Sequence, residues 1–73
     1  MKNIRIFRTN VQTNIQAKNV IAHLMLFYPR YRVNFDLNDE EKILRIETSE
    51  PEIEIKGVVK NVINMGYFCE IIE

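Results

Sequence analysis

The chain has 73 residues, which is enough for one domain over residues 1–73 and leaves no room for a separate catalytic domain. Its ten basic and ten acidic residues cancel, so no overall field attracts nucleic acid or an anionic membrane. Cys69 is the only cysteine, which excludes an intramolecular disulfide and favours a reducing compartment.

The first half of the chain predicts a strand, a helix and a second strand. Residues 3–11 are rich in β-branched and aromatic side chains, which is typical of a strand. Residues 14–28 have the apolar spacing of a helix, and Pro29 ends it. Residues 31–37 alternate between apolar and polar, which indicates a strand with one buried side. The residues expected on the buried face of the helix are Ala17, Val20, Ile21, Leu24 and Phe27.

The second half predicts a strand, a helix and a final strand. A polar turn at residues 38–41 joins the preceding strand to residues 42–48, so these two strands form a hairpin. The sequence Ser49-Glu50-Pro51 predicts the start of the second helix, and residues 67–72 form the last strand. Gly66 suits a left-handed residue after the helix. The core face of the second helix is expected to carry Ile55, Val58, Val59, Val62 and Ile63.

The order strand, helix, strand, strand, helix, strand predicts an α+β domain of the ferredoxin-like βαββαβ type. Two right-handed crossovers place both helices on one face of a four-stranded antiparallel sheet with strand order 4-1-3-2. The other face of the sheet, called the open face below, then has no covering layer.

Three segments together resemble the heavy-metal-associated domains of copper chaperones and metal-transporting ATPases. They are FRTNVQTNIQAKNV, the hairpin YRVNFDLNDEEKILRIE and the ending VVKNVINMGYFCEII. The resemblance covers essentially the whole chain, and it implies that the two metal-binding cysteines of the family are replaced here by Thr13 and Gln16. Hydroxyl and amide oxygens do not replace thiolates for a soft ion. We therefore expect no tight binding of Cu(I) or Zn(II), and no cofactor.

Thr13 and Gln16 also have a structural interpretation of their own. The pattern Thr-x-x-Gln before an apolar run is a capping box, in which each side chain bonds the backbone N–H of the other residue. An alternative is an anion or polar-ligand site at the same helix N-terminus.

Strand parity predicts an apolar patch on the open face. If Phe7, Thr9 and Val11 face the helices, the alternate residues of the first strand face the other way. The same parity turns alternate residues of the last strand outward, beside the first strand. The expected patch consists of Ile4, Ile6, Phe68 and Ile72. The alternative is that Ile4 and Ile6 only serve strand propensity, and that Arg8, Arg45 and Glu70 cover them.

These observations favour a non-catalytic protein-interaction module, acting through a protein partner or as a homodimer. No catalytic set of residues and no phosphate-binding loop stands out, so we expect no enzyme. The alternative is a carrier of a metal ion or small ligand that uses non-cysteine groups in the loop before the first helix. Binding to nucleic acid ranks last, because the third strand has no aromatic residue. Arg5 and Arg8 interrupt any apolar signal core and no stretch could span a membrane, so we expect no membrane association and a cytoplasmic location.

Overall fold

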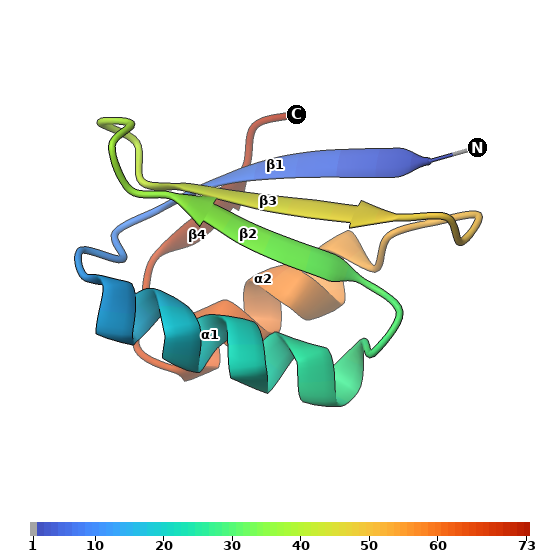
Figure 1. Cartoon of the computed structure of the whole chain (residues 1–73), viewed down its shortest axis with the longest axis horizontal. Helices are drawn as coiled ribbons and strands as arrows, with labels where there is room; N and C mark the ends of the chain where they lie inside the picture. Colours follow the sequence, from blue (N-terminus) through green and yellow to red (C-terminus); the bar gives the residue numbers. More distant parts are fainter. Residues whose placement is uncertain (1) are drawn as a thin grey trace.

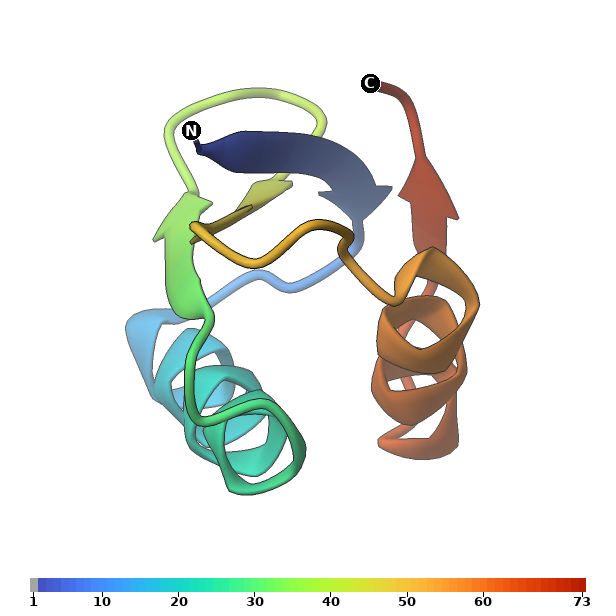
Figure 2. The ribbon, with the colours of Figure 1, turned by 90° about the vertical axis from the view of Figure 1, so that its right-hand side faces the viewer.

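A computed structural model describes residues 2–73, and it contains the six expected elements in the expected order. Both helices lie on one side of the sheet, and the β2–β3 turn and the C-terminus lie at the other side (Figures 1 and 2). The elements are β1 (Asn3–Thr9), α1 (Asn14–Phe27), β2 (Arg32–Asp36), β3 (Ile43–Thr48), α2 (Ile55–Asn64) and β4 (Cys69–Ile71).

The sheet is antiparallel with the strand order β2-β3-β1-β4, which is the predicted order 4-1-3-2 read from the other side. The predicted α+β, ferredoxin-like architecture is therefore confirmed. β1 and β3 are the central strands, and β2 and β4 are the two edges.

The core lies between the sheet and the helices, and it follows from the period-two alternation of the strands. Phe7 of β1 and Leu44 and Ile46 of β3 are fully buried. Val20 and Leu24 of α1 pack onto them from the helix layer and are also fully buried. The positive φ of Gly66, 98°, reverses the chain after α2 as expected.

The second helix begins later than the sequence pattern suggests. Its first residue is Ile55, and residues 49–54 are irregular. Two contacts hold this segment: Ile53 is buried in the core, and the hydroxyl of Tyr31 accepts a hydrogen bond from the backbone N–H of Glu54 at 2.9 Å. Pro51 therefore lies in the connection and not in the first turn of the helix.

Phe27 and Ile63, which were expected to face the core, are exposed, and so is Ile71 of the last strand. Phe27, at the last position of α1, packs its ring against His23 with the ring centres 5.0 Å apart. Ile63 lies about 100° around the helix from the buried Val62, which turns it toward solvent. Ile71 is paired with Phe7, but it belongs to the edge strand β4 and has no neighbour on its outer side.

The two helices are positioned by a close contact that the sequence pattern does not reveal. Tyr28, directly after α1, stacks on Tyr31 with the ring centres 4.8 Å apart and the planes 7° from parallel. Gly57 of α2 lies against the Tyr28 hydroxyl, and a Cβ atom at position 57 would overlap that oxygen. The absence of a side chain at Gly57 therefore allows α2 to approach the end of α1.

Candidate functional site

The loop before α1 is held by the side chains of Thr13 and Gln16. Thr13 occupies the N-cap position in an extended conformation, and its hydroxyl accepts the N–H of Gln16 at 3.1 Å. In return, the Gln16 amide oxygen accepts the N–H groups of Gln12 at 2.9 Å and Thr13 at 3.3 Å. The two side chains form a complete capping box.

This arrangement engages the oxygen atoms that would otherwise be available to a ligand. The Gln16 oxygen already accepts two hydrogen bonds, and the Thr13 oxygen accepts one. Over residues 2–73, moreover, no three His, Cys, Asp or Glu side chains are grouped so that they could hold a metal ion. The Thr13 and Gln16 side chains therefore satisfy backbone N–H groups at the start of α1.

Cys69 has the environment of a core residue. It lies in β4 opposite Thr9, with 4% of its surface exposed. Burial raises the pKa of its thiol to about 12, so the reactive thiolate is scarce at neutral pH. Cys69 therefore contributes packing and not nucleophilic chemistry.

The open face of the sheet carries isoleucines next to ion pairs. Strand register places Ile4 opposite Glu47 and Ile6 opposite Arg45. Glu47 forms ion pairs with Lys2 at 3.1 Å and with Arg45 at 3.2 Å. The hydrogen bond from Lys2 lowers the pKa of Glu47 below its ordinary value, so Glu47 is ionised at neutral pH.

A second group of ion pairs crosses the sheet from β1. Arg8 lies opposite Glu70 of β4 and forms an ion pair with it. Arg8 also contacts Glu41 of the β2–β3 turn at 3.1 Å. The guanidinium thus joins the turn to the edge strand across the open face.

The structure divides the expected apolar patch. Ile72 donates its N–H to the carbonyl of Ile6, and both lie near Ile4 of the same face. Phe68, in contrast, is separated from them along the strands by the Arg8–Glu70 pair, and its N–H bonds the Asn10 side chain. The contiguous part, called the Ile strip below, consists of Ile4, Ile6 and Ile72.

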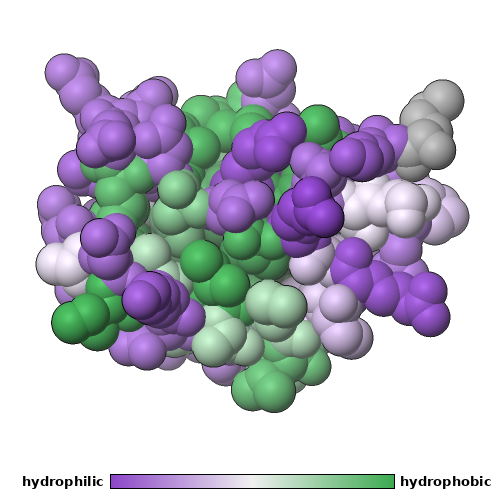
Figure 3. Space-filling model, in the orientation of Figure 1, coloured by the Kyte–Doolittle hydropathy of each residue, from purple (hydrophilic) through white to green (hydrophobic). Residues whose placement is uncertain are grey.

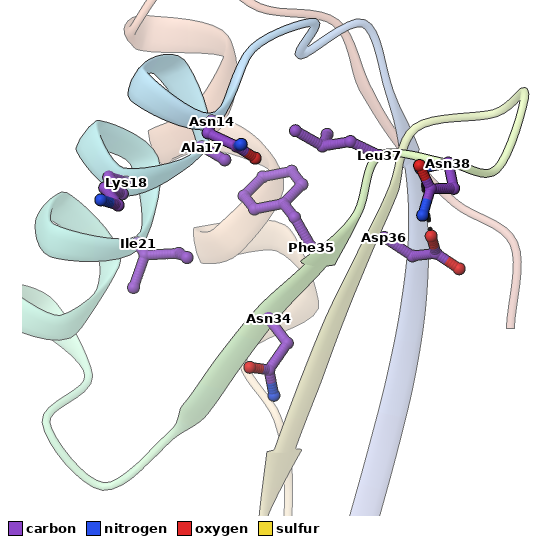
Figure 4. Close-up of a pocket in the computed structure, with 9 residues that line it drawn as sticks. All are labelled: Asn14, Ala17, Lys18, Ile21, Asn34, Phe35, Asp36, Leu37 and Asn38. Carbon is purple, nitrogen blue, oxygen red and sulfur yellow. Dashed lines mark hydrogen bonds between the residues drawn. The ribbon is translucent and has the colours of Figure 1, made fainter.

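A groove between α1 and the edge strand β2 was not anticipated from the sequence. It has a volume of about 530 Å³. Phe35 and Leu37 point toward α1, whereas Asn34 and Asp36 point away (Figure 4). Apolar surface shows in the middle of this side of the molecule, between hydrophilic groups (Figure 3). The alternation of residues 31–37 and the predicted strand order, which places this strand at an edge of the sheet, could together have indicated the groove.

Comparison with protein-family models, with curated proteins and with solved structures yields no match. Neither α1 nor α2, the helices in residues 2–73, has the length and apolar character needed to cross a membrane.

Proposed function

We propose that this domain is a non-catalytic protein-interaction module that self-associates, and that its form is that of a heavy-metal-associated domain without the metal thiols. The observation that carries the proposal is the Ile strip on a sheet face with no covering layer. Ile4 and Ile72 are 38% and 43% exposed, and both lie beside Ile6 on the same face of the sheet. Contiguous exposed apolar side chains of this kind mark interaction surfaces.

The size of the Ile strip limits how strong the contact is. Full burial of an isoleucine stabilises by about 1.5–3 kcal/mol, so burying the exposed two fifths of one side chain contributes roughly 0.6–1.2 kcal/mol. Two copies of the strip facing each other would gain roughly 2–5 kcal/mol from Ile4 and Ile72, and the partly buried Ile6 adds less. Association costs about 4–15 kcal/mol in lost freedom. The gain reaches only the lower end of this cost, so a dimer at millimolar concentration needs contacts besides the Ile strip.

The charges of the chain are compatible with a second copy as the occupant. The formal net charge is zero, so two copies do not repel each other overall. The charged residues beside the Ile strip are paired within the chain, Arg8 with Glu70 and Arg45 with Glu47. A strongly charged partner would find no excess of opposite charge at this surface.

A substitution within the Ile strip tests the proposal. Sedimentation equilibrium up to roughly 1 mM protein, where contacts of about 4 kcal/mol become populated, should show a reversible dimer. Ile6→Glu should weaken it without unfolding the chain, because a carboxylate would have to be desolvated in the contact. Phe68→Glu should have a smaller effect, since the Arg8–Glu70 pair separates Phe68 from the strip.

Ile15→Glu is the matched control. Ile15 lies on α1, in the layer on the other side of the sheet, and is 74% exposed. This variant should associate like the wild type. A wild-type chain that stays monomeric at 1 mM, or an Ile6→Glu chain that unfolds, contradicts the proposal.

The geometry gives less support to a ligand carrier. A carrier would use the loop before α1, where the Thr13 and Gln16 oxygens already accept backbone hydrogen bonds. Sub-micromolar binding of Zn(II) that is lost in Gln16→Ala would favour the carrier over the interaction module.

A further inference from the structure

The edge strand β2 carries a sequence that is complementary to itself. Its five residues, Arg32–Asp36, have Asn34 at the centre. Arg32 and Asp36 stand two residues to either side of Asn34, on the open face, and both are exposed. Within residues 2–73, neither side chain has an ion-pair partner within 4 Å.

An antiparallel pairing of two β2 strands would match every residue with a suitable partner. With Asn34 opposite Asn34 of a second copy, Arg32 lies opposite Asp36 and Asp36 opposite Arg32. On the helix side, Val33 lies opposite Phe35 in both directions. Opposite charges and apolar pairs directly across an antiparallel ladder are stabilising, and this register supplies two of each.

The two edges of the sheet differ in their suitability for such pairing. β4 has only three residues, and short edge strands are a common protection against pairing. β2 has five residues and contains neither proline nor a positive-φ residue. Its outer N–H and C=O groups therefore form a regular row that a further strand can bond.

The groove beside β2 adds apolar contact on the helix side of the same edge. Phe35 and Ile21 line it and are partly buried. Asn14, Lys18 and Ile21 of α1 face the groove, and helical spacing continues this row to Met25, which is 46% exposed. When a second β2 strand pairs in the register above, both helix layers lie on the same side of the joined sheet. The row of α1 side chains in one copy then faces the same row in the other copy.

We infer that β2 binds the β2 strand of a second copy of this chain, joining two four-stranded sheets into one continuous sheet with Asn34 on the two-fold axis. The inference rests on the proposed self-association but uses a different surface from the Ile strip. The contact is isologous, because each copy offers the same strand to the other. The two open faces then lie side by side.

Charge reversal at the two ends of β2 tests both the surface and the register. Arg32→Asp brings two carboxylates together at each end of the pairing, and Asp36→Arg brings two guanidinium groups together. Each variant should dimerise at least about tenfold more weakly than the wild type, because attraction is replaced by repulsion at two sites. An equimolar mixture of the two variants should dimerise again, since only the mixed pair restores opposite charges. Lys60→Asp, on the exposed side of α2, is the charge-matched control and should behave like the wild type.

A cysteine at the centre of β2 tests the register independently. Paired residues of an antiparallel ladder have Cα atoms about 4.5–5.5 Å apart, within disulfide reach. Asn34→Cys should therefore form a linked dimer on mild oxidation. Arg32→Cys should not, because the two positions 32 are about 14 Å apart in this register. Cys69 is buried and should not compete.

The outcomes of these experiments distinguish pairing of the β2 strands from contact through the Ile strip. If the charge-reversal mixture stays monomeric and Asn34→Cys does not link, the β2 pairing is wrong. If in that case Ile6→Glu still dissociates a wild-type dimer, the proposed self-association survives without it. If the edge variants dissociate the dimer and Ile6→Glu does not, the β2 pairing stands and the Ile strip is not the contact. A wild-type monomer at roughly 1 mM overturns both.

Discussion

The two helices of this domain begin in different ways. α1 is capped by its own sequence, because Thr13 and Gln16 exchange hydrogen bonds with each other's backbone. α2 has Glu54 at its N-cap, and no side-chain hydrogen bond caps it. The hydroxyl of Tyr31, 23 residues earlier in the chain, accepts the Glu54 N–H instead. One helix start is fixed by neighbouring residues and the other by tertiary contact.

The connection between α1 and β2 is what positions α2. Tyr28 and Tyr31 stack on each other, and the hydroxyl of each lies at the N-terminal part of α2 or directly before it. Tyr28 lies against Gly57, and Tyr31 bonds the residue just before the helix. The start of α2 should therefore respond to changes in these tyrosines more than to changes in its own preceding residues.

The largest effect is expected from Gly57→Ala. In an exposed helix this change stabilises by about 1 kcal/mol, because alanine is the better helix former. Here the new methyl group would overlap the Tyr28 hydroxyl, and overpacking costs about 1–3 kcal/mol. We expect Gly57→Ala to lower the free energy of unfolding by the difference, up to about 2 kcal/mol, as measured by urea denaturation.

A double-mutant cycle isolates this contact. Tyr28→Phe removes the hydroxyl and leaves the ring carbon Cζ at an acceptable 3.4 Å from the new methyl group. In the Tyr28→Phe background, Gly57→Ala should therefore stabilise the chain. A coupling energy below about 0.5 kcal/mol would show that α2 is not held by this approach.

The local cap of α1 should contribute less. Thr13→Ala removes the acceptor for the Gln16 N–H, which should cost about 1 kcal/mol. Ser49→Ala is the matched control, because Ser49 stands at the start that the sequence suggests for α2. Within residues 2–73 its hydroxyl makes no hydrogen bond, so the change should stay within about 0.5 kcal/mol. If Thr13→Ala and Ser49→Ala lost equal free energies of unfolding, α1 would not be capped by its own sequence any more than α2 is.

The difference between the local start of α1 and the tertiary start of α2 also explains which features could be predicted from the sequence. The alternation of the strands and the spacing of α1 gave the ferredoxin-like order, and Thr13-x-x-Gln16 gave the start of α1, because these signals span only a few residues. The start of α2 was misplaced because Tyr31 decides it from another part of the chain. The sequence leaves the division of the open-face patch open, because strand parity places Arg8 and Glu70 on that face but does not show that they form an ion pair.

The most specific effect is expected from Tyr31→Phe. At neutral pH the variant loses the acceptor for the Glu54 N–H but keeps the ring, so it should be destabilised by roughly 0.5–1.5 kcal/mol. Burial raises the pKa of Tyr31 above its ordinary value of 10.0.

The raised pKa fixes the direction of the alkaline dependence. The unfolded chain releases the Tyr31 proton first, so the contribution of the neutral hydroxyl is complete below pH 10.0 and is lost as the pH rises through the folded pKa. Because Tyr31→Phe has no proton to lose at this position, its stability should fall less steeply than that of the wild type above pH 10.0. The difference in the free energy of unfolding between the wild type and Tyr31→Phe, measured by urea denaturation from pH 7 to pH 11, should narrow. A gap that stays constant or widens would mean that the Tyr31 hydroxyl is not held neutral at the start of α2.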